Sequence, residues 1–383
     1  MHTILRRTPI AALLSAITLQ LVAFPVRAQS RLPVWTLAVE WRVGSIDGPD
    51  AFAALGSVTV SPRTGNVFVN EYNQRILAFD SAGRQLRSIG RTGGGPGEFG
   101  HLAGTFWADG LLMATDARSH RISWFTEEGE VVESRNVESG PIPSTSQRAS
   151  PRGLLANDLY LGLLHQQVQR NGLMSSDVKL LRMDGNGNDS VIAEFPDRGS
   201  WFPARGVWVP IPWVAGAMYA PHPHGDGVVI VYQGEAEDPE AALFRVRRMA
   251  GNGSLRFARS YQYTPLPLPE EYIDDFVNAR RAGIERGGLT LREAGRIIRE
   301  HMPRFQSPIA EVVLGADGTV WLKRQEEAAD VVWWWVLDRA GEPVGSLQLP
   351  RTLRVRYVQR DRLWAVETDE LGVYHLARYR IAR

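Results

Sequence analysis

Two stretches decide the fold: Val69-Asn-Glu-Tyr-Asn-Gln-Arg-Ile-Leu-Ala-Phe-Asp-Ser-Ala-Gly83 and Thr115-Asp-Ala-Arg-Ser-His-Arg-Ile-Ser-Trp-Phe-Thr-Glu-Glu-Gly129. Each contains a strand, a short polar loop that ends in Arg-Ile, a second strand and a glycine turn. The equivalent arginines, Arg75 and Arg121, are 46 residues apart, and sequence repeats of about 40–50 residues are typical of propellers and solenoids. We therefore expect a chain built from repeated antiparallel sheets.

The rest of the chain keeps the same rhythm of short strands and turns. Runs rich in Val, Leu, Ile and aromatic residues alternate with Gly and Asp turns, a pattern typical of an all-β sandwich, barrel or propeller. The repeat favours the propeller, whose four-stranded blades surround a channel. The predicted innermost strands of the blades are Ser57–Ser61, Thr105–Ala108, Gly153–Ala156, Ala217–Pro221, Ile309–Leu314 and Arg354–Val358.

The last blade has three strands of its own at the C-terminus, Arg354–Val358, Leu363–Val366 and Tyr374–Ile381. Leu37–Val43, near the other end of the chain, supplies a candidate for the missing fourth strand. A strand exchanged in this way closes the ring and hides two sheet edges. The predicted fold is all-β, a six-bladed β-propeller closed by an N-terminal strand.

Residues 269–303, between the predicted fourth and fifth blades, break the β pattern and predict a helical hairpin. Pro269 suits a first helical position, Thr290 and Glu293 match a capping box, and Pro303 ends the second helix. Two readings remain open for this insertion: it packs on the side of the ring, or it forms a lid over the channel mouth.

The N-terminus predicts export. Arg6 and Arg7 precede the apolar run Ile10–Phe24, and Val26-Arg27-Ala28 matches a signal-peptidase site. We expect residues 1–28 to be a signal peptide and residues 29–383 to be one periplasmic or secreted propeller. No later stretch is long and apolar enough to span a membrane, and the chain has no cysteine for a disulfide or a lipid anchor.

The charge balance points away from nucleic acid as a partner. Without Arg6, Arg7 and Arg27 the chain has 40 basic and 42 acidic side chains, a net charge of −2, whereas nucleic-acid-binding domains carry a strong basic excess. We expect a monomer that binds a protein, a small molecule or a glycan.

The stretch from about Ser57 to Glu133 resembles NHL-repeat propellers, in particular the secreted bacterial six-bladed β-propeller proteins. The residues that carry the resemblance are Gln74-Arg75-Ile76, Phe79-Asp80-Ser81-Ala82-Gly83, the segment Ile89–Phe99 with its Gly-Pro-Gly-Glu-Phe phrase, His120-Arg121-Ile122, Phe125 and Gly129. The resemblance covers two blades clearly and implies the fold and export. Several propellers of this type act by binding proteins or ligands, and some relatives are metal-dependent lyases or lactonases.

The polar loops 70–74 and 116–120 join second to third strands and are expected on one face of the ring. Propellers commonly bind ligands at a channel mouth, so these loops form the predicted recognition surface. For the two repeated arginines, a structural role, in which they bond loop carbonyls, is the alternative. The predicted ligand-binding residues are Glu71, Tyr72, Arg75, Asp116, Arg118, His120 and Arg121.

Two other motifs have a functional and a structural reading. The Gly-rich stretch Gly90–Gly97 suggests a phosphate loop, but a strand follows it rather than a helix, so a tight connector between blades is favoured. His222, His224 and Asp226 have the spacing of a metal pair on a strand. The alternative for this run is an exposed polar turn.

The predicted function is non-catalytic binding on the face that carries the inter-blade loops. The alternative is a hydrolase, lactonase or lyase with a divalent metal in the channel. An enzyme needs converging His, Asp or Glu on the innermost strands, and the predicted ones contain one acid, Glu311, and no histidine. We therefore expect no metal and no cofactor. A structural component of an envelope assembly is a third reading.

Overall fold

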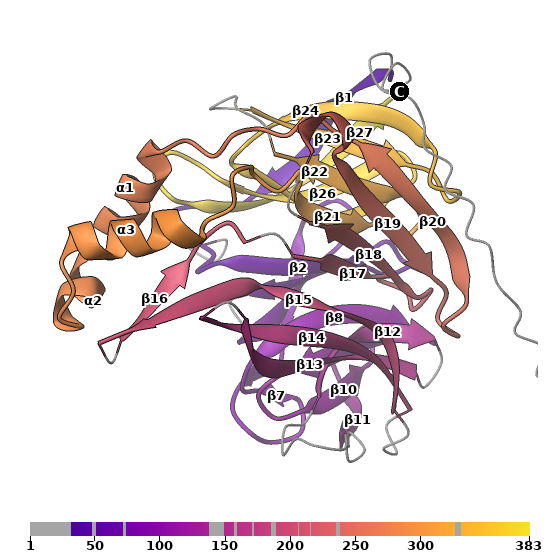
Figure 1. Cartoon of the computed structure of the whole chain (residues 1–383). Coiled ribbons are helices and arrows are strands. Elements are labelled where there is room, and N and C mark those ends of the chain that lie inside the picture. The colour runs from indigo at the N-terminus through magenta and orange to yellow at the C-terminus, as the bar shows by residue number, and fades with distance from the viewer. Residues whose placement is uncertain are drawn as a thin grey trace, which may run out of the picture.

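The computed structural model describes residues 32–47, 51–71, 74–137, 149–156, 159–170, 172–184, 189–205, 207–214, 216–234, 238–325 and 331–383. This part of the chain is all-β except for one helical segment and a short 3-10 turn (Figure 1). No helix within it is long and apolar enough to cross a membrane.

The strands form mostly antiparallel sheets in which neighbours along the chain pair with one another; β1 with β24 and the two-stranded sheet β6-β7 are parallel pairs. The four-stranded sheets have the orders β2-β3-β4-β5, β8-β9-β10-β11 and β17-β18-β19-β20, and a five-stranded sheet has the order β12-β13-β14-β15-β16. An eight-stranded sheet, β21-β22-β23-β24-β1-β27-β26-β25, joins the last strands of the chain to the first. The bounds are β1 (Val34–Val43), β2 (Leu55–Val60), β3 (Val67–Glu71), β4 (Arg75–Phe79), β5 (Gln85–Ile89), β6 (Arg91–Thr92), β7 (Glu98–Phe99), β8 (Leu102–Ala108), β9 (Leu111–Asp116), β10 (Arg121–Phe125), β11 (Val131–Asn136), β12 (Ser150–Ala156), β13 (Leu159–Arg170), β14 (Leu173–Met183), β15 (Asp189–Ala204), β16 (Val207–Ile211), β17 (Met218–Pro221), β18 (Val228–Gln233), η2 (Pro239–Ala241), β19 (Leu243–Met249), β20 (Leu255–Gln262), α1 (Glu271–Ala279), α2 (Arg281–Arg286), α3 (Leu291–His301), β21 (Ile309–Leu314), β22 (Val320–Arg324), β23 (Val331–Leu337), β24 (Pro343–Pro350), β25 (Leu353–Gln359), β26 (Arg362–Thr368) and β27 (Tyr374–Ala382).

The first strands of successive sheets contact one another in a closed ring. β2 contacts β8, β8 contacts β12, β12 contacts β17, β17 contacts β21, β21 contacts β25, and β25 returns to β2. The later strands of each sheet follow outward from this ring. Sheets that extend outward from a ring of innermost strands, one strand from each sheet, are the architecture of a β-propeller.

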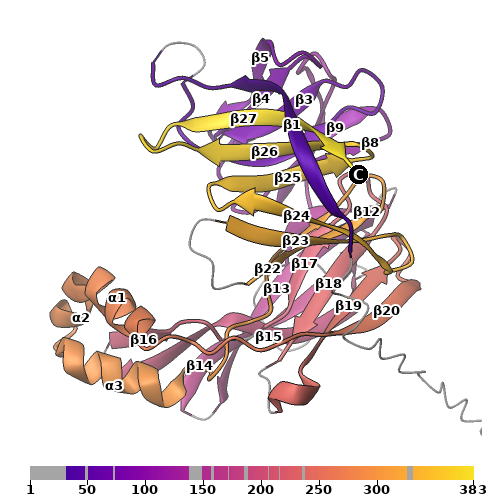
Figure 2. The same ribbon diagram turned by 90° about the horizontal axis from the view of Figure 1, so that it is seen from above.

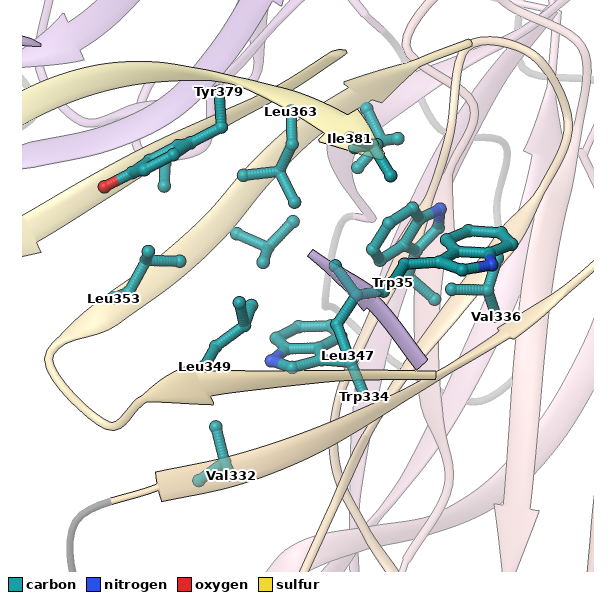
Figure 3. Packing of buried hydrophobic residues seen from close by; sticks show 14 of the residues in the cluster. Trp35, Val332, Trp334, Val336, Leu347, Leu349, Leu353, Leu363, Tyr379 and Ile381 are labelled. Atoms are coloured by element: carbon teal, nitrogen blue, oxygen red, sulfur yellow. The ribbon is translucent and has the colours of Figure 1, made fainter. Parts of the chain in front are cut away.

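β1 ties the end of the chain to its beginning. Thr36–Val43 pairs antiparallel with β27, and Val34 and Trp35 pair in parallel with β24; Figure 2 shows β1 lying across both strands. The pairing with β27 is the one that the sequence predicts. Trp35 is 6% exposed and packs edge-on against Trp321, among the apolar side chains of β23 and β24 (Figure 3).

Turns between the third and fourth strands of different sheets have the same shape because the same two residue types, Asp and Gly, form them. The Asp80 carboxylate accepts hydrogen bonds from the backbone of Ala82 and Arg84, and Gly83 has a φ of 84°. A side chain at Gly83 would meet the Trp41 ring, so the left-handed conformation and the close approach both require glycine. Equivalent Asp338 and Gly341 sit between β23 and β24.

The third sheet differs from the sequence prediction. β13, β14 and β15 are longer than the strands of the other blades, and β16 is a fifth strand that the four-stranded blade pattern does not predict. α1, α2 and α3 pack on this extension, where their apolar residues share a core with Val209 and Ile211. Figures 1 and 2 both place the helices beside β16, at one side of the molecule.

The helical segment itself departs from the prediction at its start. α1 begins at Glu271, so Pro269 lies before the helix and not at its first position. A break at Arg280, with a φ of −110°, separates α1 from α2. α3 carries the Thr290 and Glu293 capping box, which satisfies otherwise unpaired backbone N–H groups.

Candidate functional site

A cavity of about 460 Å³ lies at the centre of the ring. All six innermost strands contribute to its wall, so it is the central channel of the propeller. The lining contains no residue of α1, α2 or α3. Its members are Gly56, Ser57, Val58, Ala103, Gly104, Thr105, Phe106, Arg152, Tyr219, Ala220, Pro221, Pro223, Glu311, Val312, Val313, Leu314, Val355, Arg356 and Tyr357.

One end of this channel is closed by the turn 222–227, which follows β17. Its residues reach the last residues of the other innermost strands. Pro223 accepts a hydrogen bond from Trp107 N (2.9 Å), and Gly227 N donates to Leu155 O (3.0 Å). His224 Nε2 lies 3.3 Å from Val60 O and 3.1 Å from Tyr357 Oη. We call this turn, residues 222–227, the plug.

His222 is buried and the rest of the plug is at least partly covered, so the interpretation of its histidines as an exposed polar turn is wrong. His222 is 5% exposed, its Nδ1 accepts a hydrogen bond from His224 N (3.1 Å), and its ring bonds the backbone of Ala316. Burial, with the positive charge of Arg248, lowers the pKa of His222 to about 4. Burial also lowers the pKa of His224. Both rings are neutral at neutral pH.

Arg248 fixes the plug from the neighbouring strand β19. Its side chain is 2% exposed and donates to the backbone oxygens of Asp226 and Met249 and to the Asp226 carboxylate. Burial lowers the pKa of Arg248 to about 10, although the charge of Asp226 opposes this shift. Arg256 bonds the same carboxylate from a half-exposed position. The plug is therefore a packed, hydrogen-bonded element.

The other end of the channel lies on the face of the predicted recognition loops. Glu71, at the end of β3, is opposite Leu55, the first residue of β2. Asp116, at the end of β9, is opposite Leu102, the first residue of β8. The innermost strands therefore begin at this face and end at the plug. We call this end of the channel, which lies opposite the plug, the open end.

Charged side chains line the channel on the open-end side of the plug. Arg152 extends from β12, Arg356 from β25 and Glu311 from β21. The distance from Arg356 Nη1 to Glu311 Oε1 is 3.5 Å, and Lys323 Nζ lies 3.9 Å from the other oxygen of Glu311. Burial lowers the pKa of Arg356, and the negative charge of Glu311 opposes this shift. Two guanidinium groups against one carboxylate leave the cavity wall with an excess of positive charge.

Several polar atoms of the wall have no hydrogen-bond partner among the described residues. Nε of Arg152, Nε of Arg356 and the hydroxyls of Ser57 and Thr105 are all buried and unpaired. An unpaired buried polar group costs free energy comparable to a lost hydrogen bond. Because these atoms are themselves enclosed, the surface that a ligand can reach belongs to the rest of the two partly exposed arginine side chains, whose guanidinium groups are donors.

The first predicted loop forms a compact local cluster. Glu71 is 5% exposed and accepts hydrogen bonds from Ala53 N (3.2 Å) and from Arg75 Nε (2.5 Å). The Arg75 side chain is half-exposed. Tyr72 lies outside the described residues. The geometry leaves Arg75 as the accessible charged group of this loop.

In the second loop, the Asp116 carboxylate accepts hydrogen bonds from the backbone and so fixes the shape of the loop. Its carboxylate accepts from the N–H groups of Gly100 (2.6 Å), His101, Arg118 and Ser119. Burial raises its pKa, but these hydrogen bonds outweigh burial and hold the pKa of Asp116 below its ordinary value. The Arg118 side chain next to it is exposed. Asp116 is thus fully used in shaping the loop, which leaves Arg118 as its accessible charge.

His120 and Arg121 also bond the protein itself. His120 has a positive φ of 50°, and its Nδ1 lies 3.1 Å from Ala149 O. Arg121 is 9% exposed and donates to the carbonyl oxygens of Gly94 (2.7 Å) and Glu98. These two carbonyls belong to the Gly-rich connector, so Arg121 has the geometry of the structural alternative.

Reasoning from sequence missed the channel arginines. Arg152 lies one residue before the predicted strand Gly153–Ala156 but inside β12, and Arg356 was within a predicted innermost strand without being singled out. Their signal was available, because arginine is seldom buried and both residues lie within or next to predicted innermost strands. Among the described residues, no group of three or more His, Asp or Glu is placed to hold a metal ion.

A second cavity, of about 600 Å³, lies outside the ring beside the end of α3. Its wall includes Phe195, Tyr232, Arg245 and His301. Residues 215 and 235–237, which adjoin its lining in the chain, lie outside the described residues, so we base no site on its shape.

Comparison with known proteins gives a likeness of fold. No family model matches the chain, and no curated protein matches it. A solved structure of a DUF4221 family member from Bacteroides vulgatus covers 92% of this chain and 100% of its own, with a TM-score of 0.51 and 11% identity. At that identity the likeness extends to the fold alone.

Two further solved structures match with lower TM-scores. A β-propeller domain from Myceliophteria thermophila covers 90% of this chain and 99% of its own (TM-score 0.41, 9% identity). A calcium-binding regucalcin from Agrobacterium tumefaciens covers 92% and 97% (TM-score 0.41, 9% identity).

Proposed function

We propose that this protein is an exported, non-catalytic six-bladed β-propeller that binds a small ligand through the open end of its channel. One observation carries the proposal: the plug covers one end of the channel, while the charged side chains of Arg152, Glu311 and Arg356 line it on the other side. A dead-end pocket with a few convergent polar groups is the usual form of a ligand site.

Six blades are supported by the closed ring of six innermost strands, together with β1 as the fourth strand beside β27. The helical segment is then an insertion between the fourth and fifth blades, and its packing on β16 favours the side of the ring over a lid. Export is supported by the signal-peptide pattern of residues 1–28.

The loops at the open end extend the site outward. Arg75 and Arg118 are the accessible charged groups of the two predicted loops and are placed to contact the outer part of a ligand or a partner protein. Glu71, Asp116, His120 and Arg121 act as positioning residues, because their polar atoms already bond the loops.

A channel-filling variant tests the proposal. Ala103 lines the cavity, so Ala103→Trp fills it, whereas Ala82→Trp adds the same side chain at an exposed turn. We expect a thermal-shift panel of neutral, anionic and cationic small molecules to contain ligands that stabilise the wild type and Ala82→Trp but not Ala103→Trp. Ligands that stabilise all three proteins equally would place binding outside the channel and contradict the proposal.

A metal analysis tests the alternative that the protein is a metal-dependent enzyme. Elemental analysis of residues 29–383 should give no stoichiometric divalent metal, and a chelator should leave the unfolding temperature unchanged. About one equivalent of calcium or zinc, lost together with stability on chelation, would favour the enzyme.

A further inference from the structure

We infer that the channel ligand is a small oxyanion, a carboxylate or a phosphate, held between Arg152 and Arg356. This inference rests on the proposed function and adds the chemical class of the ligand. The positions of the two arginines support an anion between them. β12 and β25 stand third and sixth in the ring of six innermost strands, so their arginines reach one cavity from opposite walls.

The charge of the cavity wall supports the same class of ligand. Arg356 has Glu311 at 3.5 Å as a partial counter-charge, and Lys323 draws on the same carboxylate from 3.9 Å. No carboxylate lies within salt-bridge distance of Arg152 in the part of the chain that the structure describes. An anion bound between the two arginines therefore balances positive charge that the other residues of the wall leave uncompensated.

The hydrogen-bond chemistry of the two arginines also favours an oxyanion. A guanidinium group offers a planar fork of donors that matches a carboxylate or a phosphate in two-point contact. Both side chains line the cavity and are partly exposed, with 26% for Arg356, so each fork keeps surface that an anion can reach. Nε of both arginines and the hydroxyls of Ser57 and Thr105 are buried without a partner among the described residues. The accessible guanidinium donors suit oxygen atoms that carry negative charge.

The remaining wall sets the size of the ligand. Val312, Val313 and Val355 surround the charged groups, and the cavity of about 460 Å³ lies at the small end of ligand pockets. Apolar walls strengthen a charge-assisted hydrogen bond because they exclude water. A compact anion, and not a polymer or a protein segment, fits this space.

The test measures the affinity of acetate, malonate, succinate and inorganic phosphate by calorimetric titration at constant ionic strength, with chloride as the reference anion. We expect at least one of them to bind the wild type and to bind Arg152→Gln and Arg356→Gln roughly tenfold more weakly. Arg87→Gln is the matched control, because β5 is the outermost strand of its sheet. Arg152→Lys should recover part of the affinity.

The outcomes separate the inference from the proposed function. Preference for phosphate or for a carboxylate identifies which oxyanion the channel takes. Anions that bind no better than chloride, or bind the arginine variants as tightly as the wild type, would overturn the inference. If a neutral or cationic compound then still stabilises the wild type but not Ala103→Trp, the channel binds a ligand of another class and the proposed function stands.

Discussion

His224 Nε2 lies 3.3 Å from the carbonyl oxygen of Val60, which belongs to the opposite side of the ring. β17, which precedes His224, is fourth among the innermost strands, and β2, which ends at Val60, is first. One turn therefore spans the channel and joins strands three blades apart. This contact converts a through-channel into a dead-end pocket, on which the proposed binding function depends.

The plug should make stability depend on pH. The pKa of His222 falls from an ordinary 6.5 to about 4 in the folded chain, so the unfolded state binds more protons between these values. The free energy of unfolding should therefore fall as pH drops from about 6.5 to about 4, by about 3 kcal/mol from this group. Urea unfolding across this range, for the wild type and His222→Gln, measures the effect.

The comparison with His222→Gln isolates one histidine from the carboxylates that titrate in the same range. The wild type should lose more stability than the variant between pH 6.5 and pH 4. Parallel profiles would mean that His222 titrates normally and is not buried as described.

Arg248 should be essential to the plug, whereas Arg256 should not. Arg248→Met leaves two backbone oxygens and part of the Asp226 carboxylate without a donor, and we expect a loss of about 3 kcal/mol in the free energy of unfolding. Arg256→Met removes a half-exposed partner of the same carboxylate and should cost less than about 1 kcal/mol. Chemical denaturation of both variants gives the comparison; equal losses would contradict the anchoring role.

Ring closure should depend on Trp35. Trp35→Ala empties a site between β1 and the strands on either side of it, and large-to-small changes of a buried tryptophan cost about 3–5 kcal/mol. Trp208→Ala is the matched control, because Trp208 is 57% exposed on β16. Thermal unfolding should show a large drop for the first variant and little for the second. A small drop for Trp35→Ala would argue against closure through β1.

Asp116 should behave as a residue that shapes its loop. Asp116→Ala leaves four backbone N–H groups without their acceptor, and we expect a stability loss of about 2 kcal/mol. Arg118→Ala, two residues along, should leave stability unchanged because its side chain is exposed. If Asp116→Ala were as stable as the wild type but lost ligand, Asp116 would be a direct ligand contact.

Much of the fold follows from local sequence signals. The repeated phrase ending in Gly83 and Gly129 marks strand pairs and turns, because turn geometry depends on a few adjacent residues. Leu37–Val43 could be assigned to the last sheet by counting strands. β16 could not be anticipated, since its partners on β15 and the helices are set by packing and not by a local pattern.

The site is harder to predict from the sequence than the fold, for a physical reason. Periodicity shows which residues share a strand face, but it does not show which face meets the channel or what a turn touches across it. His222 and His224 are polar residues in a Gly-rich turn and predict an exposed loop, yet contacts with five other strands and turns bury them. Arg152 fell outside its predicted strand by one residue, because strand ends are the least certain part of such a prediction.

The chain has no cysteine, so a single engineered thiol can report on the channel directly. Ala103→Cys places a thiol on the cavity wall and Ala82→Cys places one on an exposed turn as the reference. The measurement is the rate of modification by an anionic and a cationic methanethiosulfonate reagent of similar size. An open, positively charged channel predicts that Ala103→Cys reacts, and that its anion-to-cation rate ratio exceeds that of Ala82→Cys by about threefold or more. No reaction, or a ratio equal to or below the reference, would contradict the account.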